Sequence, residues 1–137
     1  MSLIRSRKPH AKNITRQARG RRARADGRFA EWIAAFWLMA HGWRIVGFRT
    51  RTPYGEIDLL ARRGQVLAAV EVKRRATLEA ALEAVNPTQQ QRLLRAAASL
   101  GASRAAWRGL GVRLDLIALA PGRWPCHLQD AWRGDNS

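Results

Sequence analysis

The sequence is short of cysteine and of acidic residues, and both shortages restrict what kind of protein it encodes. Cys126 is the single cysteine, so no disulfide can form within the chain, and we expect a protein of a reducing compartment, the cytoplasm. Ten Asp and Glu stand against 25 Lys and Arg, which gives a formal net charge of +15. A charge of this size attracts polyanions, of which nucleic acids are the most common.

Signatures of several enzyme classes are also missing. The sequence contains no glycine-rich phosphate loop, no GxSxG motif and no Cys and His cluster with zinc spacing, which excludes P-loop NTPases, kinases, serine hydrolases and zinc fingers. The histidines, His10, His41 and His127, have no ligand or triad spacing, so we expect structural or surface roles. No segment approaches the roughly 20 apolar residues that span a bilayer, and no membrane partner is expected.

Charge divides the chain near residue 25. Residues 1–28 carry ten Lys or Arg against one acid, Asp26, and few large apolar groups. Such a segment cannot bury enough apolar surface to fold, so we expect a mobile basic arm at 1–25 and a single domain at 26–137. The arm either contacts phosphates or serves only solubility. The contacts would come from Arg19, Arg21, Arg22 and Arg24.

The most informative stretch runs from residue 54 to 75, YGEIDLLARRGQVLAAVEVKRR. Its composition predicts strands at 56–61 and 66–73, joined by a tight turn at 62–65. Side chains alternate across a strand, so Glu56 and Asp58 share one face of the first, while Glu71 and Lys73 share one face of the second. Antiparallel pairing then brings Asp58 close to residue 70 or 71.

Carboxylates this close raise each other's pKa unless a positive charge lies between them. An all-oxygen site suits Mg²⁺ or Mn²⁺ better than Zn²⁺. The pattern acid-any-Lys is common, however, and a surface ion-pair cluster is the alternative. Lys73 favours the metal site, because it is the only lysine beyond the first dozen residues of an arginine-rich chain. A compact ammonium can hold a water or a phosphate oxygen where a planar guanidinium cannot.

A helix is predicted over 29–40, with Asp26 as its N-cap and Gly42 after its end. Its large apolar side chains recur at helical spacing and are expected to form the buried face: Phe29, Trp32, Ile33, Phe36, Trp37 and Ala40. Glu31 lies among small neighbours and has room to reach the acidic cluster. A surface ion pair with Arg28 is the alternative.

The rest of the chain predicts alternating strands and helices. Strands are expected over 43–49 and 112–120, the latter buried on both faces. Helices are expected over 77–85 and from an Asn86-Pro87 cap to Leu100, where Gly101 would stop the second one. Residues 126–132 would add an edge strand or a short helix. Two tryptophans in loop-like contexts are expected in core or loop packing, with base stacking as the alternative, namely Trp107 and Trp124.

This order of elements resembles the PD-(D/E)XK, or restriction-endonuclease-like, nuclease core. An acid stands on the first helix, Asp58 on the second strand and Glu71-Val72-Lys73 on the third. More closely, the chain resembles the YraN family of small bacterial endonuclease-like proteins over residues 26–132. The matching positions are Glu31, GEIDL at 55–59, VEVK at 70–73, Ala84-Val85 and Arg113-Leu114-Asp115. One departure is Gln89, at a position where the family has a lysine that points toward the site.

The resemblance implies an α/β fold with an αβββαβ core, in which helices flank a mixed central sheet. It also implies a metal-dependent nuclease that acts on DNA rather than RNA, such as a branched or repair intermediate, and many enzymes of this class act as homodimers. Asp58, Glu71 and the carbonyl of Val72 would hold Mg²⁺ or Mn²⁺. Glu31 would complete the shell or orient a metal-bound water, and Lys73 would position or activate the attacking water and stabilise charge in the transition state.

Other residues receive accessory roles from the same resemblance and from their charge. Glu56 would ligate a second ion or pair with Arg113, and Gln89 would lie near the substrate. Nucleic acid would contact Arg74, Arg75 and Arg92 in addition to the arm. Two alternatives stay open: a nucleic-acid-binding protein that keeps the fold without cutting, and a structural or ribosome-associated basic protein whose acids only pair with arginines.

Overall fold

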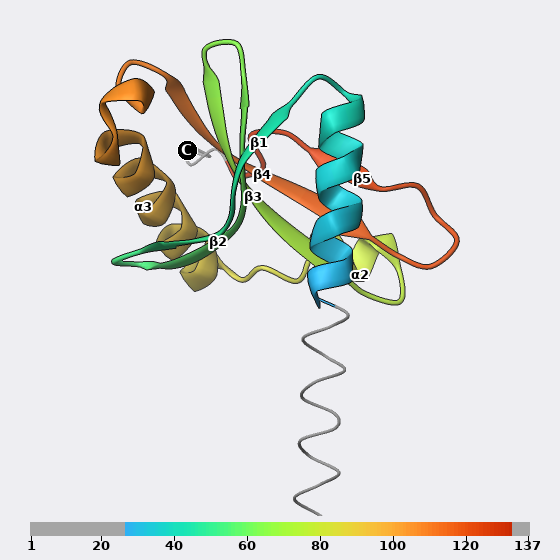
Figure 1. Ribbon diagram of the computed structural model, residues 1–137. Coiled ribbons are helices and arrows are strands. Elements are labelled where there is room, and N and C mark those ends of the chain that lie inside the picture. The colour runs from blue at the N-terminus through green and yellow to red at the C-terminus, as the bar shows by residue number, and fades with distance from the viewer. Residues whose placement is uncertain (1–26, 133–137) are drawn as a thin grey trace, which may run out of the picture.

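The computed structural model describes residues 27–132 (Figure 1). A first helix over 27–40 leads into three strands, β1 (Arg44–Thr52), β2 (Gly55–Arg63) and β3 (Val66–Arg74). Two helices follow, α2 (Leu78–Leu82) and α3 (Pro87–Ser103), and then a short 3-10 helix, η2 (Ala105–Trp107). The chain ends in β4 (Gly111–Leu119) and β5 (Cys126–Leu128). The arm predicted for 1–25 lies outside the described residues.

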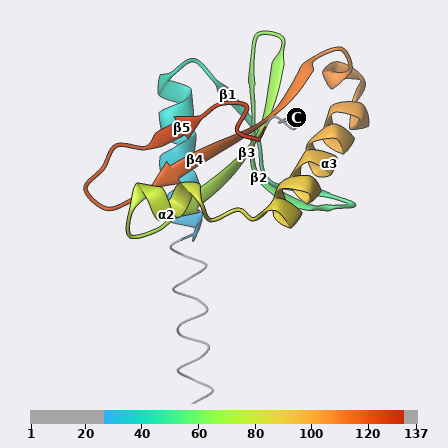
Figure 2. The ribbon, with the colours of Figure 1, turned by 180° about the vertical axis from the view of Figure 1, so that it is seen from behind.

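The strands form one mixed sheet in the order β1-β2-β3-β4-β5. β1, β2 and β3 pair antiparallel, β3 and β4 pair parallel across the connection that contains α2 and α3, and β5 pairs antiparallel with β4. The first helix and α3 lie on opposite sides of this sheet, as the front and back views show (Figures 1 and 2). The predicted α/β class and restriction-endonuclease-like architecture are therefore confirmed.

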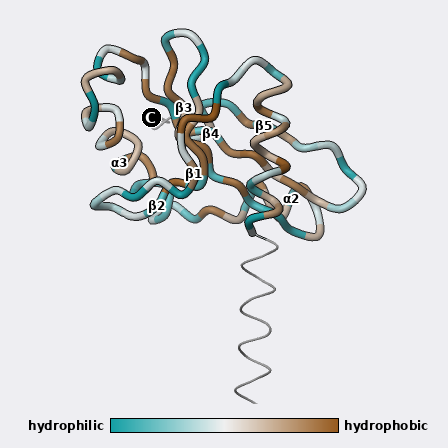
Figure 3. Tube along the Cα trace, in the orientation of Figure 1, coloured by the Kyte–Doolittle hydropathy of each residue, from teal (hydrophilic) through white to brown (hydrophobic). Residues whose placement is uncertain are grey.

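Two hydrophobic cores result from the alternation of side chains along β3 and β4. Ala68 and Val70 of β3 join the core under the first helix, whereas Leu67 and Ala69 join the core under α3. The colouring by hydropathy follows this arrangement, with hydrophobic sequence along the central strands and hydrophilic sequence in the turns (Figure 3). The predicted buried strand is confirmed, since Leu114 to Leu119 are all buried in β4.

The first helix packs through a different face from the predicted one. Its buried residues are mostly small: Ala30, Ala34, Ala35 and Leu38. Small side chains allow the helix to approach the sheet closely, opposite Ala61 and Ala68, whereas aromatic rings would hold it away. Of the residues predicted to be buried, Phe29, Trp32 and Phe36 are instead 59%, 50% and 61% exposed, and Ala40 is exposed too. Trp37 is half-buried, and only Ile33, also half-buried, packs against the core as predicted.

The predicted cap of α3 is confirmed and its predicted end is wrong. Asn86 Oδ1 accepts a hydrogen bond of 2.8 Å from the main-chain N–H of Gln89, and Pro87 opens the helix. Gly101 lies inside the helix rather than after it. A Cβ atom at this position would be 2.4 Å from Cγ2 of Val112, so the glycine permits α3 to pass close to β4.

Smaller differences concern α2, the last strand and two tryptophans. α2 is shorter than the predicted helix over 77–85, and residues 126–132 provide the edge strand β5 rather than a helix. Trp107 is buried in the core under α3, whereas Trp124 is 81% exposed in the loop before β5. Its ring centroid lies 6.0 Å from that of Trp37.

Asp115 is a fully buried carboxylate that joins β4 to the segment after it. It accepts hydrogen bonds from Nε and Nη2 of Arg113, both 2.9 Å, from Nε2 of His127 at 2.8 Å, and from the main-chain N–H of Asp130 at 2.9 Å. Burial acts to raise the pKa of Asp115, but the hydrogen bonds from His127 and Arg113 hold it below its ordinary value.

Replacing Asp115 with alanine is therefore expected to destabilise the fold. It leaves Arg113 and His127 without their partner, and removal of one member of a buried pair costs about 3–5 kcal/mol. Urea unfolding at neutral pH measures this loss, and Glu79→Ala, at an exposed acid in the first turn of α2, is the control. A loss for Asp115→Ala no larger than that of the control would contradict the assignment.

Asp115 should also make the free energy of unfolding fall at acidic pH. Its folded pKa lies below the unfolded value of about 3.9, so its contribution is complete above that value and disappears as the pH falls through the lower folded pKa. We expect the part of acid destabilisation that is due to this group to be missing in Asp115→Ala. Unfolding curves of parent and variant across the acid range test this.

Candidate functional site

The acidic residues of the central hairpin meet where β2 begins and β3 ends, next to the start of the first helix. A cleft of about 660 Å³ opens there. Its lining includes all four charged residues proposed from the sequence as catalytic: Glu31, Asp58, Glu71 and Lys73. The remaining lining residues are Gly27, Ala30, Val72, Arg74, Arg75, Ala76 and Pro121.

The register of the hairpin explains why Asp58 and Glu71 are neighbours. The pairs between β2 and β3 run from Arg63 and Val66 to Leu59 and Val70, and Asp58 and Glu71 come next on the two strands. Beyond the last of these pairs, a side-chain hydrogen bond links the two strands. Oδ2 of Asp58 accepts a hydrogen bond of 2.9 Å from the N–H of Val72. Asp58 is thereby held against the segment that carries Glu71 and Lys73.

Burial and crowding raise the pKa values of both carboxyl groups. Burial has the largest effect on Glu71, the charge of Asp58 adds to it, and Lys73 acts in the opposite direction; together they raise the pKa of Glu71 to about 7. Burial also raises the pKa of Asp58, although the N–H of Val72 opposes it. Nζ of Lys73 lies 3.3 Å from Oε2 of Glu71. Near neutral pH the pair therefore tends to retain a proton unless a cation replaces it.

Glu31 reaches the cleft from the first helix and forms an ion pair with Arg49 rather than with Arg28. Burial, followed by the charge of Asp58, raises the pKa of Glu31, and Arg49 opposes this shift. The carboxylate of Glu31 is thus close enough to Asp58 to be affected by its charge, but the guanidinium of Arg49 already binds it.

Arg49 is a residue of the site that the sequence did not predict. It has a backbone φ of 46°, in the left-handed region, and it follows a register shift of β1 between Ile45 and Gly47. Left-handed backbone costs a residue other than glycine about 1–2 kcal/mol, so the surrounding structure must hold it there. A strand-like sequence pattern carries no signal for such a conformation.

The donors of the cleft suit a hard cation in part. Mg²⁺ is commonly held by one or two carboxylates, with waters and substrate phosphates completing its shell, and Asp58, Glu71 and the carbonyl of Val72 match this requirement. Within residues 27–132, however, no group of three or more His, Cys, Asp and Glu side chains is arranged to hold a metal ion. Glu31, which lines the same cleft, is ion-paired with Arg49.

The residues predicted to have accessory roles are divided between the cleft and other parts of the protein. Arg74 and Arg75 line the cleft. Glu56 lies near enough to raise the pKa values of Glu31 and Asp58, and its own carboxylate is 3.6 Å from Nε of Arg51. The suggested pair of Glu56 with Arg113 is not formed, because Arg113 binds Asp115.

Two residues of α3 lie outside the cleft lining. Gln89 is in the first turn of the helix, and Arg92 donates a hydrogen bond of 2.9 Å to the carbonyl of Tyr54 in the β1–β2 turn. The structure thus brings together Glu31, Asp58, Glu71, Val72, Lys73, Arg74 and Arg75, and it separates Gln89, Arg92 and Arg113 from them. The arginines of the arm, Arg19, Arg21, Arg22 and Arg24, fall outside the described residues.

Comparison with known proteins identifies the family. The sequence model of the uncharacterised protein family UPF0102 matches residues 30–119, which contain β1 to β4 and every charged residue of the cleft. The chain belongs to this family. UPF0102 is the YraN family, so the resemblance seen in the sequence is confirmed.

Relatives within UPF0102 are similar over nearly their whole length. A UPF0102 protein of Caulobacter vibrioides is 67% identical over 119 residues, which cover 87% of this chain and 95% of the relative. One from Caulobacter sp. strain K31 is 60% identical over 132 residues, which cover 96% and 94% of the two chains. A third, from Maricaulis maris, is 49% identical over 112 residues, which cover 82% and 88%.

No helix within residues 27–132 combines the length and the apolar character that crossing a bilayer requires.

Glu71 gives the stability of the protein a pH dependence of defined sign. Its pKa is about 7 in the folded chain and about 4.3 in an unfolded one. The folded state therefore holds the proton more tightly, and the free energy of unfolding falls as the pH rises between these two values. We expect Glu71→Gln, which cannot ionise, to reduce this fall and to be more stable than the parent above neutral pH.

Urea unfolding at a series of pH values, in buffer without divalent cations, tests the effect. Glu79→Gln removes an exposed acid of α2 and serves as the matched control. Identical pH profiles for the parent and Glu71→Gln would show that Glu71 does not retain a proton in the folded state.

Proposed function

We propose that this protein is a nuclease that uses a divalent cation to hydrolyse phosphodiester bonds in DNA. The observation that carries the proposal is the convergence of Asp58, Glu71 and Lys73 in one cleft of a restriction-endonuclease-like fold. Two adjacent carboxyl groups with raised pKa values favour a cation between them, and the excess of basic residues favours a polyanionic substrate.

Each residue of the cleft has its own role in the proposed hydrolysis. Asp58, Glu71 and the carbonyl of Val72 would hold Mg²⁺ or Mn²⁺, which when bound polarises the phosphoryl group and lowers the pKa of water. The ammonium of Lys73 helps to position the substrate and donates a hydrogen bond to the phosphate oxygen on which negative charge develops in the transition state. Arg74 and Arg75, at the same cleft, bind the neighbouring phosphates of the strand.

A second candidate is a DNA-binding protein that keeps the nuclease fold without cutting. The ion pair between Arg49 and Glu31 favours it, because it occupies the acid that would otherwise supply a third ligand. The position of Gln89 outside the cleft favours it too, since this residue replaces the lysine of the family pattern. Both candidates bind DNA, so cation binding and cleavage have to be measured separately.

Cleavage should depend on Asp58 and Lys73. We expect Mg²⁺ or Mn²⁺ to support cutting of one or more labelled single-stranded, duplex, flap and junction DNAs. Asp58→Asn and Lys73→Met should each reduce the rate by about 100-fold or more, the loss seen when a single stabilising group is removed from an active site. Glu79→Gln, outside the cleft, should cut like the parent. Parent protein that cuts none of these DNAs would exclude the nuclease, as would an Asp58→Asn variant that cuts at the parental rate.

Cation binding can be tested without any substrate. A cation that binds only the folded state raises stability, by about 1.4 kcal/mol at a concentration tenfold above its dissociation constant. We expect Mg²⁺ or Mn²⁺ to raise the thermal midpoint of the parent and to have little effect on Asp58→Asn. An equal rise in both proteins would place the cation elsewhere, and a rise without cleavage would support the second candidate.

A further inference from the structure

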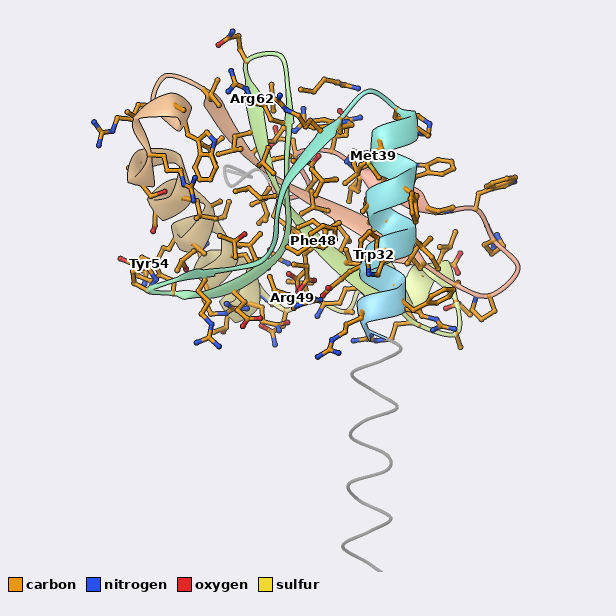
Figure 4. All side chains as sticks on the ribbon, in the orientation of Figure 1. Trp32, Met39, Phe48, Arg49, Tyr54 and Arg62 are labelled. Carbon is orange, nitrogen blue, oxygen red and sulfur yellow. The ribbon has the colours of Figure 1, made fainter. Side chains whose placement is uncertain are left out.

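The outer face of the first helix carries a row of exposed aromatic rings. Phe29, Trp32 and Phe36 recur at helical spacing on the side opposite the alanines that pack on the sheet. The ring centroid of Trp32 lies 5.9 Å from that of Phe36 and 5.1 Å from that of Phe48 on β1, with the planes tilted by 33° and 41°. We call these four residues the aromatic row. Figure 4 shows Trp32 and Phe48 facing each other between the helix and β1.

Packing of the fold accounts for Phe48, which is half-buried against the core under the first helix, but not for the exposed rings of Phe29, Trp32 and Phe36. The helix is already fixed through Ala30, Ala34, Ala35 and Leu38, which lie in the core. Each aromatic side chain offers about 150–250 Å² of surface, so several exposed together make an apolar patch of the size that usually marks a binding surface. The row therefore points to a ligand.

The row is continuous with the cleft. Gly27, Ala30 and Glu31 of the same helix line the cleft, and Trp32 follows directly in the sequence. On β1, Arg49 follows Phe48, and its guanidinium reaches Glu31. The ion pair of Arg49 with Glu31 thus lies where the aromatic row meets the acidic cleft. Figure 4 shows Arg49 next to Phe48 at this junction.

The residue types at this junction indicate the class of ligand that binds there. Aromatic rings bind the faces of bases, and cations bind the phosphates between them; this combination is typical of surfaces for single-stranded nucleic acid. A regular duplex does not fit, because its base faces are covered by stacking. A second copy of the chain fits poorly as well, since each copy carries a net charge of +15.

We infer that the aromatic row is a stacking platform for the unpaired bases of a DNA strand whose backbone continues past Arg49 into the cleft. This inference rests on the proposed function and narrows its substrate to DNA with a single-stranded segment. Arg49 has a side chain that is 41% exposed, so it can contact a phosphate of that strand at the edge of the cleft.

Binding without cleavage tests the platform. A fluorescein-labelled oligothymidylate of about 20 nucleotides is titrated with full-length protein in EDTA, and fluorescence anisotropy gives the dissociation constant. We expect Trp32→Ala and Trp32→Leu to weaken binding by about tenfold, the effect of losing one stacked base, and Trp32→Phe to retain most of it. Trp32→Leu keeps apolar area without a ring and so separates stacking from general hydrophobicity.

Matched controls come from the same protein. Tyr54 is an exposed aromatic residue at the tip of the β1–β2 turn, away from the first helix, and Met39 is an exposed apolar residue on that helix without a ring (Figure 4). Tyr54→Ala and Met39→Ala should bind like the parent. Arg49→Ala should weaken binding more than Arg62→Ala, which removes the same charge at the far end of β2. Thermal midpoints of all variants verify that they are folded.

Several results would overturn the inference. They are no binding of the oligothymidylate by the parent, equal losses in Trp32→Ala and Tyr54→Ala, and an equal loss for a hairpin duplex of the same length. Two others would assign the row to a different partner: a parental dimer in light scattering that Trp32→Ala abolishes, or vesicles of phosphatidylglycerol as the only ligand that Trp32→Ala loses.

The outcome is independent of the cleavage experiment. If the parent cuts no DNA but Trp32→Ala loses oligothymidylate binding while Tyr54→Ala does not, the platform stands and the nuclease is excluded. If Asp58-dependent cleavage is observed but Trp32→Ala binds like the parent, the nuclease stands and the platform is excluded.

Discussion

Two carboxyl groups held against each other at the open end of a hairpin are the constraint on which the site depends. Asp58 and Glu71 meet there because the β2–β3 register ends at the pair just before them and because the N–H of Val72 fixes Asp58. Partial burial makes their joint ionisation unfavourable, so this end of the sheet requires a proton or a cation. Lys73 compensates only part of the charge. This electrostatic penalty, in a cleft open to solvent, is the basis on which we propose that a cation binds here.

The two faces of the first helix have separate roles. Its alanines allow close packing on the sheet, and this proximity brings Glu31 to the cleft. Because small residues suffice for packing, the aromatic side chains of the helix are available on the opposite side. The sheet is likewise divided, with the core under α3 on one face and the core under the first helix on the other. The cleft thus lies beside the closely packed helix, whereas Gln89 and Arg92 of α3 lie outside it.

Much of the fold follows from local signals in the sequence. Short apolar runs on both sides of Arg62-Arg63-Gly64-Gln65 predict the hairpin, and a hairpin of this length brings Asp58 and Glu71 together. Asn86-Pro87 marks the start of α3 by its capping chemistry. Periodicity did not predict the buried face of the first helix correctly, because both of its faces carry apolar residues. The shape of the opposing sheet determines that the alanine face, rather than the aromatic face, packs against it. Gly101 and Arg49 were missed for a related reason, since their conformations are set by neighbours distant in the sequence.

The irregular path of β1 has one more consequence. β1 forms an outer edge of the sheet, where unpaired N–H and C=O groups invite a strand from another molecule. The register shift between Ile45 and Gly47 and the left-handed backbone of Arg49 interrupt the regular spacing of those groups. The opposite edge, β5, is only three residues long. The irregular backbone that brings the guanidinium of Arg49 to Glu31 therefore also protects the sheet against edge-to-edge aggregation.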